Sequence, residues 1–211
     1  MRIEIVRTRE FSGARAVLAE ACEAVAHAVA RDSSLACSPS WPTVRLVLGG
    51  MAEADFWSVP REAMGFFAVM SSGETDEENE DTVYFEVNDH LEAHVNLDAA
   101  INEMEEAGGW DLADVESWLA TIPHELLHVK EWMDETDGKT PGEVFDSGQG
   151  ELSVKEVYLA VEARHAAAGN ETEDAVERTA LWMAGSAMTH ASVASIAERL
   201  AQAAPAASRR R

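Results

Sequence analysis

Two histidines and a glutamate near the middle of the chain have a spacing that can bind a metal ion. The segment Thr121–Val129 reads TIPHELLHV and carries His124, Glu125 and His128. On an α-helix, residues four apart lie one turn above each other, with Cβ atoms about 5–6 Å apart. His124 and His128 can therefore converge on one zinc ion, with Glu125 beside it.

This pattern predicts hydrolytic chemistry. Zinc held by three protein ligands keeps a fourth position for water and lowers the pKa of that water to about 7. Glu125 would take the proton as general base while the water attacks a polarised carbonyl, and would later return the proton to the leaving amine. The neighbouring Leu126, Leu127 and Val129 indicate a buried helix, in which histidines without partners would be costly.

The start of this helix has two interpretations. Proline is poorly tolerated inside a helix but is common in its first turn. Either the helix begins at Pro123, or a longer helix from about Asp114 kinks there. We expect the helix to end near 134–138.

Other periodic segments predict the elements that position this helix. Helical spacing is expected at 12–31, 98–107, 151–168 and 172–203, and strands at 43–48, 65–70, 82–87 and 92–97, with the last two paired. The acidic tract 74–81 and the segment 139–150 are expected to be loops. These elements predict one α+β domain over residues 1–203, with a strand-rich part at about 43–97, a metal-binding and helical part at about 111–203, and a frayed tail at 204–211.

The charge of the chain excludes some classes of partner. The formal net charge is −23 at pH 7, from 39 acidic and 16 basic residues. Nucleic acids and anionic membrane surfaces would repel such a protein. The N-terminal segment lacks the apolar core of a signal peptide, and no apolar run reaches the roughly 18 residues of a membrane span. We therefore expect a cytoplasmic protein with no nucleic-acid or membrane partner.

The HExxH motif, together with the order of strands and helices, resembles the zincin-like metallopeptidases. The resemblance implies a small twisted sheet with mostly antiparallel edges, packed on the HExxH helix, with further C-terminal helices. It also implies a zinc cofactor and a peptide or protein substrate, held by strand addition at a sheet edge. A different class remains open, in which the same fold is a binding or regulatory module with little or no hydrolytic activity.

The third zinc ligand has two candidates. In one zincin pattern, HExxHxxGxxH, it is a histidine, but this chain has Asp134 at that position, and on a continuous helix Asp134 rotates away from the two histidines. The remaining pattern resembles the group whose third ligand is a glutamate on a later helix. Glu151 is the first residue of the predicted helix 151–168 and lies on its apolar face. Glu177 lies in the segment 177–184, ERTALWMA, which resembles a stretch of the ImmA/IrrE-type metallopeptidases.

His94 is a candidate substrate-binding residue. It lies on the predicted strand 92–97, which we expect to be the peptide-holding edge next to the cleft. From there its imidazole could orient a substrate or stabilise an oxyanion. The alternative is a histidine on the surface of a strand.

Overall fold

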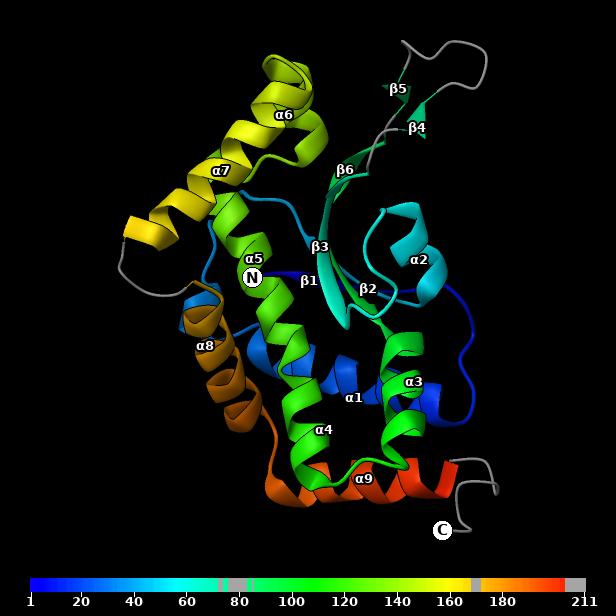
Figure 1. Ribbon diagram of the computed structural model, residues 1–211. Coiled ribbons are helices and arrows are strands. Elements are labelled where there is room, and N and C mark those ends of the chain that lie inside the picture. The colour runs from blue at the N-terminus through cyan, green and yellow to red at the C-terminus, as the bar shows by residue number, and fades with distance from the viewer. Residues whose placement is uncertain (72–73, 76–82, 85, 168–171, 204–211) are drawn as a thin grey trace.

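A four-stranded mixed sheet lies at the centre of the fold (Figure 1). The computed structural model describes residues 1–71, 74–75, 83–84, 86–167 and 172–203. The strand order is β1-β2-β6-β3, with β1, β2 and β6 parallel and β3 antiparallel to β6. The bounds are β1 Ile3–Arg7, β2 Val44–Gly49, β3 Gly65–Met70 and β6 Val87–Asn96. Two short strands, β4 Glu74–Thr75 and β5 Val83–Tyr84, pair separately.

Helices cover both faces of the sheet, with α1 and α5 on one side and the short α2 on the other (Figure 1). Their bounds are α1 Ala14–Val29, η1 Ser33–Leu35, α2 Met51–Phe56, α3 Leu97–Ala107, α4 Leu112–Leu119, α5 Thr121–Thr136, α6 Pro141–Ser147, α7 Glu151–Ala167, α8 Thr172–Ala187 and α9 His190–Ala203. The α+β class expected from the sequence is confirmed. None of the helices in the described ranges has the length and apolar character that a membrane crossing requires.

The alternation of side chains along β6 separates the two layers. Leu91, Ala93 and Val95 belong to the main core, together with buried residues of α1 and α5. Glu92 and His94 point to the opposite face because successive side chains of a strand alternate. A smaller core on that face contains Ala54 of α2 and the buried residues of β3, Phe66 and Ala68.

Several expectations about the sheet were wrong. The expected pairing of 82–87 with 92–97 is not formed by the described residues, since Val83–Tyr84 (β5) pair with β4 and Val87 is the first residue of β6 itself. β6 is not an edge, because β2 and β3 pair with it on either side. Of the two edge strands, β3 runs antiparallel to its neighbour β6 and β1 runs parallel to its neighbour β2. The sequence did not predict β1 as a strand, because charged residues interrupt its short apolar run.

Two helical expectations also need correction, and one helix was not predicted. The predicted loop 139–150 contains α6, which Thr140 caps through its hydroxyl and which has Pro141 in its first turn. The predicted helix 172–203 is two helices, α8 and α9. A helix at Met51–Phe56 was not foreseen. In the predicted loop 74–81, Glu74–Thr75 form the short strand β4, whereas residues 76–81 and the tail 204–211 lie outside the described residues.

The HExxH helix starts two residues before the proline. α4 ends at Leu119, Ala120 keeps a right-handed helical conformation, and α5 begins at Thr121. Pro123 lies in the first turn of α5, where a backbone N–H has no intrahelical acceptor, so the missing donor costs little. The helix ends at Thr136, and Asp137 follows in the left-handed region with φ 55°. The expected end is thereby confirmed.

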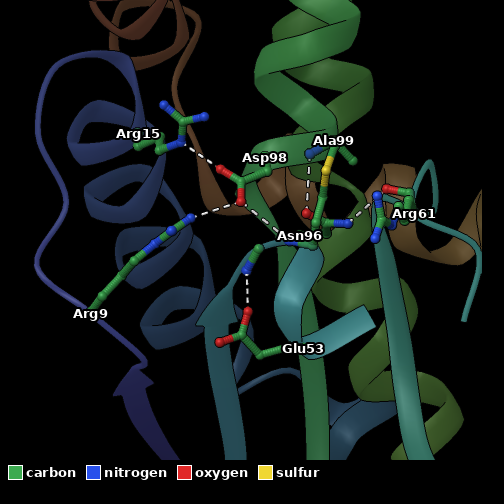
Figure 2. A network of polar contacts seen from close by, with 9 residues as sticks. Arg9, Arg15, Glu53, Arg61, Asn96, Asp98 and Ala99 are labelled. Carbon is green, nitrogen blue, oxygen red and sulfur yellow. Dashed lines mark hydrogen bonds and ion pairs between the residues drawn. The ribbon is translucent and has the colours of Figure 1, made fainter. Parts of the chain in front are cut away.

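A carboxylate ties together the carboxyl ends of the parallel strands (Figure 2). Asp98, in the first turn of α3, accepts hydrogen bonds from Arg9 (2.7 Å), Arg15 (2.6 Å) and the backbone N–H of Met51 (3.2 Å). A Cβ at Gly50 would clash with this carboxylate, so glycine permits the close approach. Burial raises the pKa of Asp98, but the hydrogen bonds outweigh it, and the pKa lies below its ordinary value.

We predict that Asp98→Asn destabilises the protein by about 1–3 kcal/mol at pH 7, since hydrogen bonds to a charged group are lost. A depressed folded-state pKa contributes stability above the unfolded pKa of about 3.9 and loses it as pH falls through the folded value. The difference between the two proteins should therefore shrink below about pH 4. Urea unfolding across pH measures this. Asp55→Asn is the matched control, because the Asp55–Arg61 pair is more exposed. Equal effects of the two changes would contradict the prediction.

Candidate metal centre

Helix α5 divides its side chains between the core and the metal-binding motif. Leu126, Val129 and Trp132 are buried in the core, and Trp132 makes an edge contact with Phe67 of β3. The two motif histidines lie elsewhere on the helix surface and are only partly buried. The apolar residues of α5 thus fix the helix against the sheet.

The two histidines lie next to each other as the spacing predicted. The Nε2 atoms of His124 and His128 are 3.0 Å apart, and the rings meet edge to face with centroids 4.7 Å apart. Two imidazole nitrogens bound tetrahedrally to zinc at 2.0–2.1 Å would lie about 3.3 Å apart. The observed separation is close to that value, so both nitrogens can reach one ion with a small adjustment.

Glu131 contacts the other ring nitrogen of His128. Its Oε2 lies 3.3 Å from Nδ1 of His128. A carboxylate at this position accepts the Nδ1 hydrogen and leaves the Nε2 lone pair for a metal, which is the usual arrangement around metal-binding histidines. Glu131 was not among the candidate site residues predicted from the sequence. The i, i+3 spacing on a helix was the signal that could have found it.

Glu125 is buried, with 6% of its surface exposed. Its side chain lies against the first residue of β3, because a Cβ added at Gly65 would be 2.7 Å from Cγ of Glu125 and 2.7 Å from Cγ2 of Thr121. The absence of a side chain at Gly65 therefore lets the β3 edge and the catalytic candidate approach each other. The sequence showed Gly65 only as the start of a strand.

A pocket of about 310 Å³ contains His124 and Glu125. Elements far apart in the sequence form its wall, with Ser117 from α4, Thr121 from α5, Gly65 from β3 and Glu177 and Leu181 from α8. Figure 1 shows α8 lying beside α5 and the α4–α5 junction. Of the two glutamates considered as third ligand, Glu177 is the one that shares a pocket with the motif.

Glu151 occupies a different environment. It forms an ion pair with Lys155 on its own helix, and it does not line the pocket of His124. Its helix, α7, starts beside α6 at the opposite end of α5 (Figure 1). Asp134 pairs with Lys130 one turn away, which fits its predicted rotation away from the two histidines.

A complete metal-binding group is not assembled among the described residues. No three His, Cys, Asp or Glu side chains in that part of the chain lie together closely enough to hold an ion. The two imidazoles form a matched donor pair, and Glu177 contributes an exposed side chain on the wall of the same pocket. In this arrangement the carboxylate of Glu177 does not lie close enough to the two imidazoles to form a three-donor group with them.

His94 is placed on the side of the sheet opposite α5. It is 4% exposed and stacks on Phe66 with ring centroids 4.6 Å apart, and its Nε2 lies 3.3 Å from Glu92. It does not line the pocket of His124. The expectation of an exposed edge was wrong because Glu92 and His94, although polar, are buried against Arg45 and Phe66.

Comparison of the chain with protein-family descriptions, curated proteins and solved structures finds no match in any of the three. A function must therefore be inferred from the chemistry of the residues at this site.

Proposed function

We propose that this protein is a zinc-dependent metallopeptidase of zincin type. The observation that carries the proposal is the 3.0 Å separation of the Nε2 atoms of His124 and His128, beside a pocket that also contains Glu125. Two imidazole donors next to a buried carboxylate are part of the arrangement by which a zinc site with a third protein ligand activates water at a carbonyl. The proposed substrate is a peptide or protein.

Each residue of the site has a proposed role. His124 and His128 would hold zinc, Glu177 would complete the protein ligands, and Glu131 would orient the ring of His128. The ion would polarise the scissile carbonyl and make water acidic enough to lose a proton near neutral pH. Glu125 would accept that proton and deliver it to the leaving amine, which departs as a neutral group.

The exposed edge of the sheet next to the pocket is β3, not the strand that carries His94. β3 is the last strand in the sheet order, and Met64 and Gly65 at its start line the pocket. An extended peptide added to this edge would form backbone hydrogen bonds and would pass close to Glu125. This geometry supports a peptide as substrate over a small molecule.

The proposal is tested by incubating zinc-loaded protein with a proteome-derived peptide library and identifying new peptide termini by mass spectrometry. We expect cleavage that a chelator abolishes and that added zinc restores. Bound zinc without cleavage would favour the binding or regulatory module. Cleavage that persists in chelator with no bound metal would contradict the proposed chemistry.

Gly65→Ala is expected to reduce hydrolysis while leaving the zinc content unchanged. The new methyl group would lie 2.7 Å from atoms of Glu125 and Thr121 and would displace the general base. A displacement of about 1 Å can cost about 100-fold in rate. The measurement is the rate on a peptide identified from the library. Gly185→Ala is the control, because a Cβ there has no neighbour within 4 Å. Equal rates for the two variants would contradict the proposed position of Glu125.

A further inference from the structure

The carboxyl ends of the three parallel strands meet at a hollow of about 560 Å³. Arg9 follows β1 by two residues, Met51 follows β2 by two, and Asp98 follows β6 by two, and all three line the hollow. In open sheets with parallel strands, ligands bind outside the carboxyl ends of the strands. The hollow therefore lies where such a fold presents a ligand site.

Two arginines are held at this hollow by one carboxylate (Figure 2). Nη2 of Arg9 and Nε of Arg15 each bond one oxygen of Asp98, at 2.7 Å and 2.6 Å. The guanidinium groups come from the loop before α1 and from α1 itself, so they are brought together only by folding. Asp98 has 16% of its side chain exposed, whereas Arg9 and Arg15 have 50% and 39%.

Among the described residues, the side-chain hydrogen bonds of these arginines go to Asp98, which leaves most of their N–H donors for a ligand, and the Arg9 guanidinium also lies over the Phe11 ring. A guanidinium has five N–H donors in a planar fork, and each arginine uses one of its nitrogens on Asp98. Ser12 and Asn102 add uncharged donors to the wall of the hollow. Such forks match the oxygens of a carboxylate or phosphate group.

The N-terminus of α1 adds a second source of positive potential. The 16-residue helix begins after Gly13, which has φ 58°, and no side chain caps it. Its first turn contains no acidic residue, and the space beside Gly13 is open. Uncapped N–H groups and the helix dipole favour an anion at this end.

The local charge balance differs from that of the whole chain. The protein carries a net charge of −23, but at this hollow Arg9 and Arg15 face Asp98 and the exposed Glu10. Glu10 also lies near the guanidinium of Arg7. The pKa of Arg7 is raised, chiefly by the hydrogen bond that Arg7 donates to Glu23. The hollow is thus close to neutral, so an anion meets far less repulsion here than the net charge suggests.

We infer that Arg9 and Arg15 form a binding site for a small oxyanion, the phosphate or carboxylate group of a ligand. Asp98 is the positioning residue that holds both guanidinium groups with their outer donors facing the hollow. The site is separate from the proposed metal centre and shares no lining residue with its pocket.

The test is a titration of the full-length protein with inorganic phosphate and, separately, with sodium acetate, followed by ¹H–¹⁵N NMR at constant ionic strength. We expect saturable shifts of the Arg9 and Arg15 Nε–H signals and of the amides at the start of α1. Two charge-assisted hydrogen bonds correspond to a dissociation constant on the order of 1 mM. Tighter binding of phosphate would identify a phosphate ligand, and equal or tighter binding of acetate would identify a carboxylate.

Arg15→Gln should weaken binding about tenfold or more. Arg199→Gln is the matched control, because Arg199 also pairs with one carboxylate and has a similar exposure of 45%. Arg15→Lys, which keeps the charge but loses the fork, should bind with intermediate affinity. Shifts that fail to saturate up to about 50 mM in the wild type, or identical curves for Arg15→Gln and Arg199→Gln, would overturn the inference. The ion pairs would then serve only to fix the loop before α1.

Discussion

Replacing Glu125 with glutamine will reduce peptide hydrolysis by about 10²–10⁴-fold and leave bound zinc in place. Glutamine has nearly the same shape, so it fits beside Gly65, but its amide cannot accept the proton of the attacking water. The proposed zinc donors, His124 and His128, are unchanged. Steady-state rates on a cleaved peptide, measured together with zinc content, test the prediction.

Glu135→Gln provides the control for this experiment. Glu135 lies on the same helix but is exposed, on a turn beyond the motif. Its replacement removes the same charge from α5 without changing the pocket, so the rate should stay near that of the wild type. A Glu125→Gln protein that keeps its full rate would show that another group takes the proton.

Glu177→Ala will lower the affinity for zinc, whereas Glu151→Ala will not. Loss of a residue that only supports a metal ligand costs about 10–100-fold in affinity, and loss of a ligand itself should cost at least as much. Glu177 shares the pocket of His124, while Glu151 lies on α7 and is paired with Lys155 of that same helix. Competition with a chromophoric chelator gives the two dissociation constants.

The stability of both variants should stay close to that of the wild type, because exposed or half-exposed glutamates away from the core change the free energy of unfolding by less than about 0.5 kcal/mol. A difference in zinc affinity would then report on ligation and not on folding. Reduced affinity in Glu151→Ala alone would identify Glu151 as the ligand. Unchanged affinity in both variants would exclude the two glutamates.

Local sequence patterns predicted the helix that carries the motif. The apolar spacing of Leu126 and Val129 placed the buried face of α5, and the left-handed Asp137 and the following Gly138 account for its end. The proximity of His124 and His128 follows from helix geometry alone. These features depend on residues within a few positions of each other, so they could be inferred without the fold.

Features that depend on partners distant in the sequence could not be inferred in this way. His94 looked like an exposed strand residue, but Phe66 of β3 and Glu92 bury it. Glu92 and His94 are polar, which is typical of a strand face open to solvent, but Ala54 of α2 and the β3 residues Phe66 and Ala68 form a small core on that face. The order of the strands was hidden for the same reason, because β6 pairs with a parallel strand from much earlier in the chain.

The preference for Glu177 over Glu151 as the proposed third zinc ligand rests on how the later helices pack against α5. Glu151 and Glu177 both lie on amphipathic segments after the motif, and nothing in their local sequence says which end of α5 each helix contacts. The fold places α8, not the start of α7, next to His124 (Figure 1). The arrangement of helices therefore supports the proposal of Glu177 over Glu151, which sequence periodicity had left equal.

The most direct test of a zinc site at His124 and His128 is elemental analysis of tag-free protein, for the wild type and His128→Ala in parallel. We predict about one zinc per chain in the wild type and a near-complete loss in the variant. Circular dichroism should show the same helix content in both, because the side chain of His128 is only partly buried. No zinc in the wild type after incubation with the metal at neutral pH, or equal zinc in both proteins, would contradict the proposed metal centre.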